Sequence, residues 1–259
     1  MNFQKVPLQA GLYFVGMPIG SARDITLRAL DVLASADMLV AEDTRSLRKL
    51  MDIHGVPLAG RPLVALHDHS GDAVVGRLVR SMKEGQSVAY ASEAGMPLIA
   101  DPGFELSRAA VMAGVMQTCA PGPSAVLTAL TLAGLPTDAF FFGGFLPNAK
   151  SARRTALEAV RTVAATLAYY ESPKRLGAML ADAADIEVVG EAGDYGELRG
   201  LMRATRCDVL VLDINLPGRS GLDVMHVLKD EGSAVKVLVV SMYPEDQYAI
   251  RALRAGAYG

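Results

Sequence analysis

Short apolar runs recur along the first two thirds of the chain, and each ends in a turn rich in Gly, Pro or charged residues. The clearest run is Ser87–Ala91, which is followed directly by Ser-Glu-Ala-Gly-Met-Pro-Leu-Ile-Ala-Asp-Pro-Gly over 92–103. Such a run is typical of a buried strand in a parallel sheet, and open α/β sheets bind ligands at the carboxyl ends of these strands. We therefore predict that 92–103 carries the chemistry, although any turn between a strand and a helix needs Gly and Pro for its backbone geometry.

The same order of strand, turn and helix is expected several more times. An apolar run over 11–16 leads through a Gly/Pro turn into a helix that opens at Asp24 or Thr26. A helix over 104–113 is expected to stop at Gly114, because glycine readily adopts the left-handed conformation that ends helices. Further strands are predicted over 37–41, 62–66, 116–120, 140–145 and 166–170. This alternation predicts an α/β fold with a parallel sheet.

Composition narrows the class of protein. The chain has 259 residues, 51% of them hydrophobic, which suffices for one large domain or for two to three small ones. It contains no uninterrupted apolar run of about 18 residues, and its first residues lack an apolar signal core, so we expect a soluble cytoplasmic protein with no membrane partner. Cys119 and Cys207 lie far apart, which fits a reducing compartment and argues against a zinc or disulfide framework.

Charge is distributed unevenly. Residues 1–184 carry 17 basic and 16 acidic side chains, whereas residues 185–259 carry 8 and 12. This asymmetry indicates two modules of different origin. The balance of the first part is too even to predict a nucleic-acid partner by itself, because domains with a broad phosphate footprint usually carry a clear positive excess.

Charged residues follow the strand predicted over 37–41. Glu42, Asp43 and Arg45 come directly after it. Packing explains such a cluster poorly, because charged side chains are seldom buried without a partner, so a functional role is one interpretation. The alternative is an ordinary solvated helix start, with Asp43 or Thr44 as its N-cap.

Two histidines flank Asp68 after the strand predicted over 62–66. His67 and His69 invite a metal interpretation. Two such neighbours on a loop without a third ligand are more often ordinary polar residues, so we predict no metal site.

Later turns place further polar residues at strand ends. Pro121-Gly-Pro-Ser-Ala follows one strand, with Ser124 as the expected cap of the next helix, and free amides at a helix start favour polar ligands. Lys150, Arg153 and Arg154 form a basic helix start that either faces phosphate or is merely solvated. Glu171 ends the strand predicted over 166–170.

Seven blocks, in order and spacing, resemble one family over about the first 180 residues. It is the ribosomal RNA small-subunit methyltransferase I family, of the tetrapyrrole (corrin/porphyrin) methylase fold. The blocks are Met17-Pro-Ile-Gly with Asp24-Ile-Thr-Leu-Arg-Ala-Leu, Ala41-Glu-Asp-Thr-Arg, 92–103, Pro121-Gly-Pro-Ser-Ala, Gly134-Leu-Pro-Thr-Asp, Gly144-Phe-Leu-Pro and Tyr170-Glu-Ser-Pro-Lys-Arg.

The resemblance implies transfer of a methyl group from S-adenosylmethionine to the ribose 2′-hydroxyl of a cytidine in small-subunit rRNA, so the partner is that rRNA or the 30S subunit. It also implies two α/β domains, a cofactor cleft between them and, usually, a homodimer. The candidates that orient the substrate or assist its deprotonation are Glu42, Asp43 and Glu171, and sequence does not identify the base. Phosphate-facing cations would be Arg45, Lys150, Arg153, Arg154 and Arg175. Cofactor contacts would be Ser92, Glu93, Ala94, Gly95, Pro97, Pro121, Gly122, Ser124 and Ala125.

The chain departs from the family pattern in two ways. The family usually has Asn, Asp, Thr, Gly and His where this chain has Ser21, Glu93, Met96, Leu98 and Lys174. The family sequence also continues and completes a second α/β domain, which is truncated here. A methylase acting on a tetrapyrrole is a weaker rival, because the Pro18-Ile-Gly and Glu171-Ser-Pro blocks favour the rRNA branch.

From residue 185 onward the chain resembles the receiver domain of two-component response regulators, which has a flavodoxin-like fold. By that resemblance Asp213 would accept a phosphoryl group, Ser241 would sense it, and the Asn215 backbone would lie near Mg²⁺. The first strand, its helix and the fifth strand with its Lys are missing, and one carboxylate does not make the family's Mg²⁺ site. We therefore expect little phosphotransfer, a vestigial Asp213, and Mg²⁺ only if this fragment were functional.

The expected organisation is a methylase amino-terminal domain over 1–120, a truncated second methylase domain over 121–184 and a partial receiver over 185–259. The first functional hypothesis is the rRNA methyltransferase, with activity impaired by truncation. The alternatives are a signalling protein with Asp213 as phosphoacceptor and a non-functional chimeric fusion. No DNA-binding output domain is expected.

Overall fold

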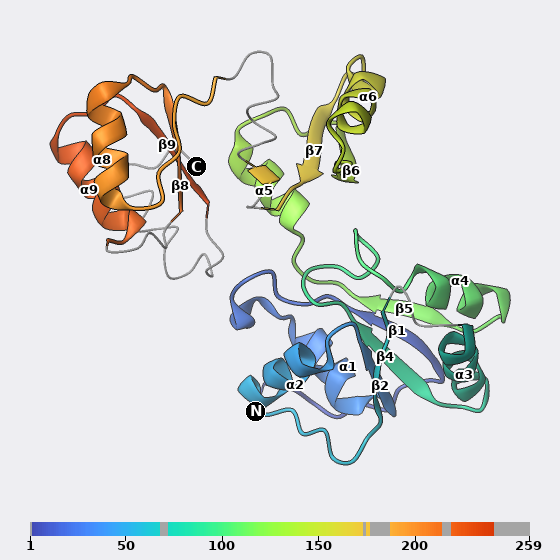
Figure 1. Cartoon of the computed structure of the whole chain (residues 1–259). Coiled ribbons are helices and arrows are strands. Elements are labelled where there is room, and N and C mark those ends of the chain that lie inside the picture. The colour runs from blue at the N-terminus through green and yellow to red at the C-terminus, as the bar shows by residue number, and fades with distance from the viewer. Residues whose placement is uncertain (1, 68–71, 173–174, 177–186, 214–218, 241–259) are drawn as a thin grey trace. The chain divides into compact units, whose positions relative to one another are not determined.

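The computed structural model describes residues 2–67, 72–172, 175–176, 187–213 and 219–240 (Figure 1). The chain divides into two compact units, Met1–Thr128 and Ala129–Gly259. The finer division at residues 120 and 184 stays a prediction. Within the described ranges, none of the helices is both long and apolar enough to cross a bilayer.

The first unit is built on a five-stranded sheet in which every pairing is parallel. Its strands follow the spatial order β3-β2-β4-β1-β5. They are β1 (Gly11–Val15), β2 (Met38–Ala41), β3 (Leu63–Ala65), β4 (Ser87–Ala91) and β5 (Gln117–Ala120). The strands predicted from the apolar runs in this part of the chain are confirmed, and so is the parallel α/β architecture. β1 and β4 lie in the interior and are buried along their whole length, as strands covered on both faces are.

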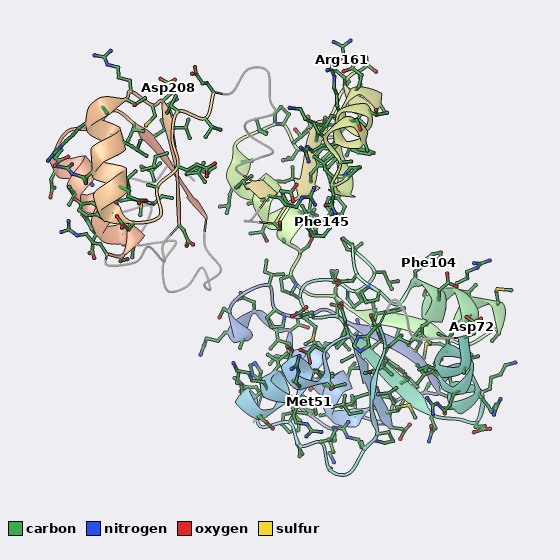
Figure 2. The ribbon with its side chains drawn as sticks, in the orientation of Figure 1. Met51, Asp72, Phe104, Phe145, Arg161 and Asp208 are labelled. Atoms are coloured by element: carbon green, nitrogen blue, oxygen red, sulfur yellow. The ribbon has the colours of Figure 1, made fainter. Side chains whose placement is uncertain are left out.

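Helices cover both faces of this sheet (Figure 1). α1 (Leu27–Ser35) and α2 (Thr44–Ile53) share one core with Tyr13 and Val15, whereas α3 (Asp72–Lys83) and α4 (Phe104–Met112) share the other with Leu12 and Phe14. Successive residues of β1 thus serve opposite cores, as the pleat of a strand requires. Figure 2 shows the side chains on α2 and α4, among them the buried Met51 and the exposed Phe104 at the start of α4.

Capping residues fix where the helices begin and end. The Thr26 hydroxyl accepts a hydrogen bond from the Ala29 N–H at 3.2 Å, so α1 opens after Thr26, while Asp24 belongs to a short 3-10 turn, η1 (Ala22–Asp24). Asp43 caps α2 by accepting from the Arg45 N–H at 2.8 Å. Gly114, with φ +67°, lies just beyond α4 as expected.

Arg61 secures the carboxyl end of α1. Its Nη1 donates to the carbonyls of Leu33 and Ala36 at 2.7 and 2.9 Å, its Nη2 to that of Pro57 at 2.8 Å, and its Nε to that of Leu58 at 3.0 Å. The last carbonyls of a helix have no partner inside the helix, so a planar guanidinium that collects them ties α1 to the loop before β3. Partial burial lowers the pKa of Arg61, and Asp37 opposes that shift.

Asp37 joins the amino ends of β2 and β4. Its carboxylate accepts hydrogen bonds from the Ser87 hydroxyl at 2.6 Å and from the Ser87 N–H at 2.8 Å. In return, the Asp37 N–H donates to the carbonyl of Ser87 at 3.0 Å. The hydrogen bonds from Ser87 lower the pKa of Asp37, because they favour its charged form.

The second unit contains a short parallel pair and its crossover helix. β6 (Phe140–Phe145) pairs with β7 (Thr166–Tyr170), and α6 (Lys150–Val160) connects them. The register shifts between Phe142 and Phe145, where Gly144 adopts φ +63°. α5 (Ala125–Ala133) precedes this pair and runs through the boundary between the units. Phe145, labelled in Figure 2, stays exposed although its ring packs edge-on against Tyr170.

A second parallel pair follows in the same unit. β8 (Val209–Asp213) pairs with β9 (Lys236–Val240), and α8 (Tyr195–Ala204) and α9 (Gly221–Asp230) supply a small core around Leu212 and Met225. Residues 187–190 form no strand.

We predict that Arg61→Lys destabilises the first unit. Lysine keeps the charge but cannot span the carbonyls that the guanidinium fork joins, so the free energy of unfolding should fall by about 1–3 kcal/mol. Amide exchange of α1, measured by mass spectrometry, reports the change. Arg77→Lys on the exposed face of α3 is the control, and equal exchange in the two variants would contradict the clamp.

We also predict a pH dependence from Asp37. Its lowered folded pKa means that its stabilising contribution is complete above the usual aspartate pKa of 3.8 and is lost as the pH falls through the folded value. Asp37→Asn should therefore lower the thermal midpoint most near neutral pH, and the difference from the unsubstituted chain should shrink below about pH 4. Asp52→Asn is the exposed control. A difference that grows on acidification would refute this assignment.

Candidate functional site

The loops that follow β4, β1 and β5 meet because these strands are neighbours in the sheet. The Gly16 N–H donates to the carbonyl of Ala120 at 2.9 Å, which joins the ends of β1 and β5. Met17 and Gly95 exchange two backbone hydrogen bonds at 2.8 and 3.0 Å, which joins the loop after β1 to the loop after β4. The loop after β1 thus lies between segments 92–97 and 121–125, which the sequence analysis predicted to contact the cofactor.

Glycine permits the close approach of these loops. A Cβ atom on Gly16 would lie 2.6 Å from the N and Cα atoms of Gly122, and one on Gly122 would lie 2.9 Å from the Cα and C atoms of Gly16. Gly95 has φ +71°, and a Cβ atom there would lie 3.8 Å from the carbonyl oxygen of Pro123. The loops after β1 and β5 therefore touch backbone against backbone, and Gly95 lies beside Pro123, so segments 92–97 and 121–125 lie at the same edge of the sheet, as the sequence predicted.

The residues of 92–97 differ in what they can offer a ligand. Ser92 is buried, and its hydroxyl donates to the carbonyls of Gly95 and Ala94 at 3.2 and 3.3 Å, so it shapes the turn. Pro97 is buried as well, whereas Glu93 and Ala94 are exposed. Glu93 and Ala94 are thus the side chains that solvent reaches first.

The rest of the loop after β4 is held by Tyr90. Its hydroxyl donates to the carbonyl of Pro102 at 2.6 Å, and a Cβ atom on Gly103 would lie 2.8 Å from its ring. Leu98 and Ala100 have φ values of +69° and +61°, a region that favours glycine. Leu98 stands where the resembling family usually has Gly, so this chain accepts a strained backbone at that point.

Thr26, expected from the sequence only as a possible helix start, also contacts the loop after β5. Besides capping α1, its hydroxyl donates to the carbonyl of Pro121 at 3.3 Å, which ties the helix start to the loop after β5. The only sequence feature that pointed to Thr26 was its place in the Asp-Ile-Thr-Leu block. A hydroxyl at a helix start can serve a neighbouring loop as well as its own helix.

The acids after β2 lie at the same edge of the sheet, since β2 is the neighbour of β4. Asp43 is bound by Arg45 through Nε at 3.1 Å and Nη2 at 3.0 Å, and these bonds lower its pKa to about 2. The hydrogen bond to Asp43 is the main cause that raises the pKa of Arg45, and the negative charge of Glu93 adds to it. The N-cap interpretation of Asp43 is confirmed, and its low pKa makes it a poor proton acceptor near neutral pH.

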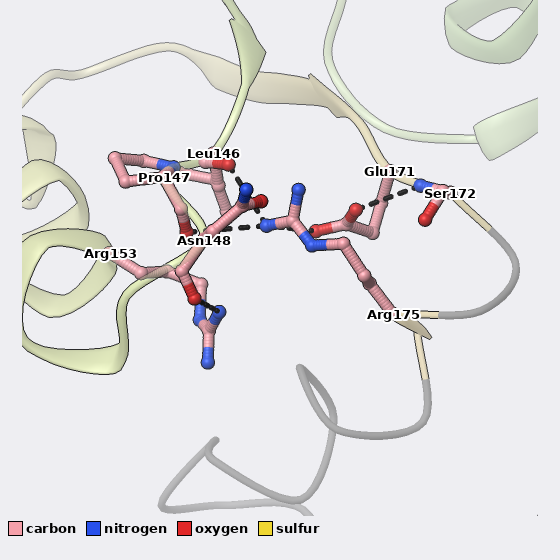
Figure 3. A network of polar contacts seen from close by, with 7 residues as sticks. All are labelled: Leu146, Pro147, Asn148, Arg153, Glu171, Ser172 and Arg175. Carbon is pink, nitrogen blue, oxygen red and sulfur yellow. Dashed lines mark hydrogen bonds and ion pairs between the residues drawn. The ribbon is translucent and has the colours of Figure 1, made fainter.

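In the second unit, Glu171 and Arg175 hold the carboxyl ends of β6 and β7 together (Figure 3). Arg175 Nη2 lies 3.3 Å from Glu171 Oε2 and donates to the carbonyls of Leu146 and Pro147 at 3.0 and 3.2 Å. Glu171 Oε1 accepts from the Ser172 N–H at 2.8 Å. The Glu171 side chain is only 7% exposed, and its Oε2 accepts no hydrogen bond within the described ranges.

The basic residues predicted to face phosphate are placed differently from one another. Arg153 is buried, and its Nη1 donates to the carbonyl of Asn148 at 3.3 Å, while Arg175 is engaged with Glu171 and two carbonyls (Figure 3). Lys150, Arg154 and Arg45 are exposed. Their phosphate-facing roles stay predictions.

Two further predictions fall partly outside the described residues. His67 is described, but Asp68 and His69 are not, and the described residues contain no group of three potential metal ligands. Asp213 lies exposed at the end of β8, whereas Asn215 and Ser241 are outside the described ranges.

Arg175→Lys tests the clamp of Figure 3. A lysine ammonium cannot reach Glu171 and two carbonyls in the same planar arrangement, so local stability should fall by about 1–2 kcal/mol. Faster amide exchange in peptides that cover 140–147 and 166–172 would show this. Arg154→Lys, on the exposed side of α6, is the matched control, and unchanged exchange in the Arg175 variant would refute the clamp.

Comparison with known proteins gives two matches along the chain. Residues 11–193 match the tetrapyrrole (corrin/porphyrin) methylases, and residues 172–259 match the response regulator receiver domain. Relatives named ribosomal RNA small subunit methyltransferase I are 47% identical in Mesorhizobium japonicum and 44% identical in Escherichia coli O157:H7, each over 184 residues. These alignments cover 71% of this chain and 61% and 63% of the relatives, so the chain spans about three fifths of their length.

Solved structures give a weaker likeness. The uroporphyrin-III-C-methyltransferase of Thermus thermophilus is 27% identical with a TM-score of 0.41, over 54% of this chain and 66% of that one. A diphthine synthase is 21% identical with a TM-score of 0.49, over 62% and 65%. The sequence matches carry the assignment, and they agree with the parallel sheet and the converging loops of the first unit. A receiver-domain match over 172–259 overlaps the end of the methylase match and continues beyond it. The chain belongs to the tetrapyrrole (corrin/porphyrin) methylase family.

Proposed function

We propose that this chain is an S-adenosylmethionine-dependent methyltransferase of small-subunit rRNA, and that its acceptor is the ribose 2′-hydroxyl of a cytidine. The observation that carries the proposal is the convergence of 92–97 and 121–125 around the loop after β1. The relatives' names support the substrate class. The 30S subunit as partner, a homodimeric state and a cytoplasmic location belong to the same proposal.

The loops suit a small cofactor because glycines let their main chains approach each other where side chains would intrude. Gly16 and Gly122 bring their main chains close to each other, and Glu93 and Ala94 of the neighbouring loop are exposed. When bound, S-adenosylmethionine would supply a methyl group on its sulfonium: the aligned hydroxyl oxygen would attack the methyl carbon, S-adenosylhomocysteine would leave along the same line, and a base would take the hydroxyl proton. In this proposal 92–97 and 121–125 hold and orient the donor.

The three candidate carboxylates, Glu42, Asp43 and Glu171, differ in their surroundings and therefore in the role that each can take. Asp43 is held by Arg45 with a pKa of about 2, so it suits orientation of Arg45 better than proton removal. Glu42 is half-buried beside it, and Glu171 in the second unit has one oxygen, Oε2, that accepts no hydrogen bond within the described residues but is ion-paired with Arg175 Nη2 at 3.3 Å. We propose these two glutamates as the candidates that orient or deprotonate the hydroxyl. Exposed Arg45, Lys150 and Arg154 would contact rRNA phosphates.

The receiver-like part does not support a competing proposal. Asp213 is the sole member of the predicted phosphoacceptor set within the described residues, and the lack of the family's other acidic ligands stays a prediction from the sequence. Mg²⁺ would matter only if this part bound it.

Labelled methyl transfer to 30S subunits that lack the modification tests the proposal. The full chain should transfer label from S-adenosylmethionine, and nuclease digestion should release it as 2′-O-methylcytidine. Gly122→Ala should lower the rate at least about tenfold, because the new Cβ would collide with the Gly16 backbone and displace a loop that must align the donor.

Gly76→Ala on α3 is the matched control, since a Cβ atom there meets nothing within 4 Å. Label recovered on a base would overturn the ribose assignment. Absence of transfer together with absence of cofactor binding would overturn the enzyme proposal.

A further inference from the structure

The Met96 side chain extends from the loop after β4 to the loops after β1 and β5, where Gly16 and Gly122 touch. Its Sδ accepts a hydrogen bond from the Gly122 N–H at 3.2 Å. The same sulfur lies 3.1 Å from the point that a Cβ atom on Gly16 would occupy. One side chain therefore touches the backbone at the carboxyl ends of β1 and β5 while its own backbone belongs to the loop after β4.

The neighbours of Met96 leave it little freedom. Gly95, the preceding residue, is fixed by its two backbone hydrogen bonds to Met17, and the contact between Gly16 and Gly122 limits the space beyond the sulfur. A thioether is unbranched and polarizable, so it fills irregular gaps and accepts weak hydrogen bonds. Since the sulfur lies against this contact, the separation of 92–97 from 121–124 depends on the Met96 side chain.

We propose that Met96 is a positioning residue that sets the spacing of the two cofactor segments and fixes the direction of the Gly122 amide. The inference rests on the proposed function and deepens it. Met96 acts through Gly122, so it need not touch the cofactor. Threonine, which the resembling family usually has here, is shorter, so the spacing device is a property of this chain.

Met96→Leu tests the inference, because leucine keeps most of the volume and removes the acceptor. Titration calorimetry of the full chain with S-adenosylmethionine should show a dissociation constant about three- to tenfold higher, the size expected when one hydrogen bond is lost. The thermal midpoint of each variant shows that it remains folded. Met112→Leu is the matched control, because Met112 on α4 is 78% exposed, and its dissociation constant should not change.

Met96→Gln separates an acceptor role from simple packing. Its amide oxygen restores an acceptor within reach of the Gly122 N–H, so it should recover part of the affinity that leucine loses. Equal loss in the leucine and glutamine variants would overturn the acceptor role. Unchanged affinity in Met96→Leu, with the unsubstituted chain binding normally, would overturn the inference and leave the proposed function intact. If the unsubstituted chain gives no heat at millimolar cofactor, the proposed function and this inference both fail.

Discussion

The backbone contact between Gly16 and Gly122 is the constraint on which the candidate site depends. It exists because β1 lies between β4 and β5 in a parallel sheet, so the loops that follow these three neighbouring strands lie at one edge of the sheet. The hydrogen bonds between Met17 and Gly95 then hold the loop after β4 against the loop after β1. A larger side chain at Gly16 or Gly122 would push these two loops apart, so the spacing of the candidate site is sensitive to a single added methyl group.

Much of the fold follows from local patterns. The apolar runs give the strands, and Thr26, Asp43 and Gly114 mark helix ends because caps and stops are formed by residues close in sequence. The convergence of 92–97 with 121–125 was also predictable, since parallel strands that neighbour each other deliver their loops to one edge.

The remaining features depend on partners that are distant in sequence. Arg153 and Arg175 look like phosphate-facing cations, yet the structure turns both to carbonyl groups of the segment after β6. The contact between Met96 and Gly122 and the role of Arg61 at the end of α1 likewise require knowledge of which loops meet. Composition and spacing carry no such information.

The second unit, where the two family matches meet, has a less complete hydrophobic core than the first. The methylase match ends soon after β7, and the pair β6 and β7 leaves Phe140 and Phe145 exposed. The pair β8 and β9 buries Leu212 and Val237 but leaves Val209 and Val211 exposed. Parallel sheets are normally covered on both faces, so these short pairs have weaker cores than the five-stranded sheet. The stability of the chain should therefore rest mainly on its first unit.

Amide exchange measured with and without S-adenosylmethionine tests the central claim most directly. If one crevice holds the donor, peptides covering 16–20, 92–97 and 121–125 should all exchange more slowly with the cofactor, while peptides from α3 stay unchanged. Protection confined to one of the three segments, or to none, would contradict the account.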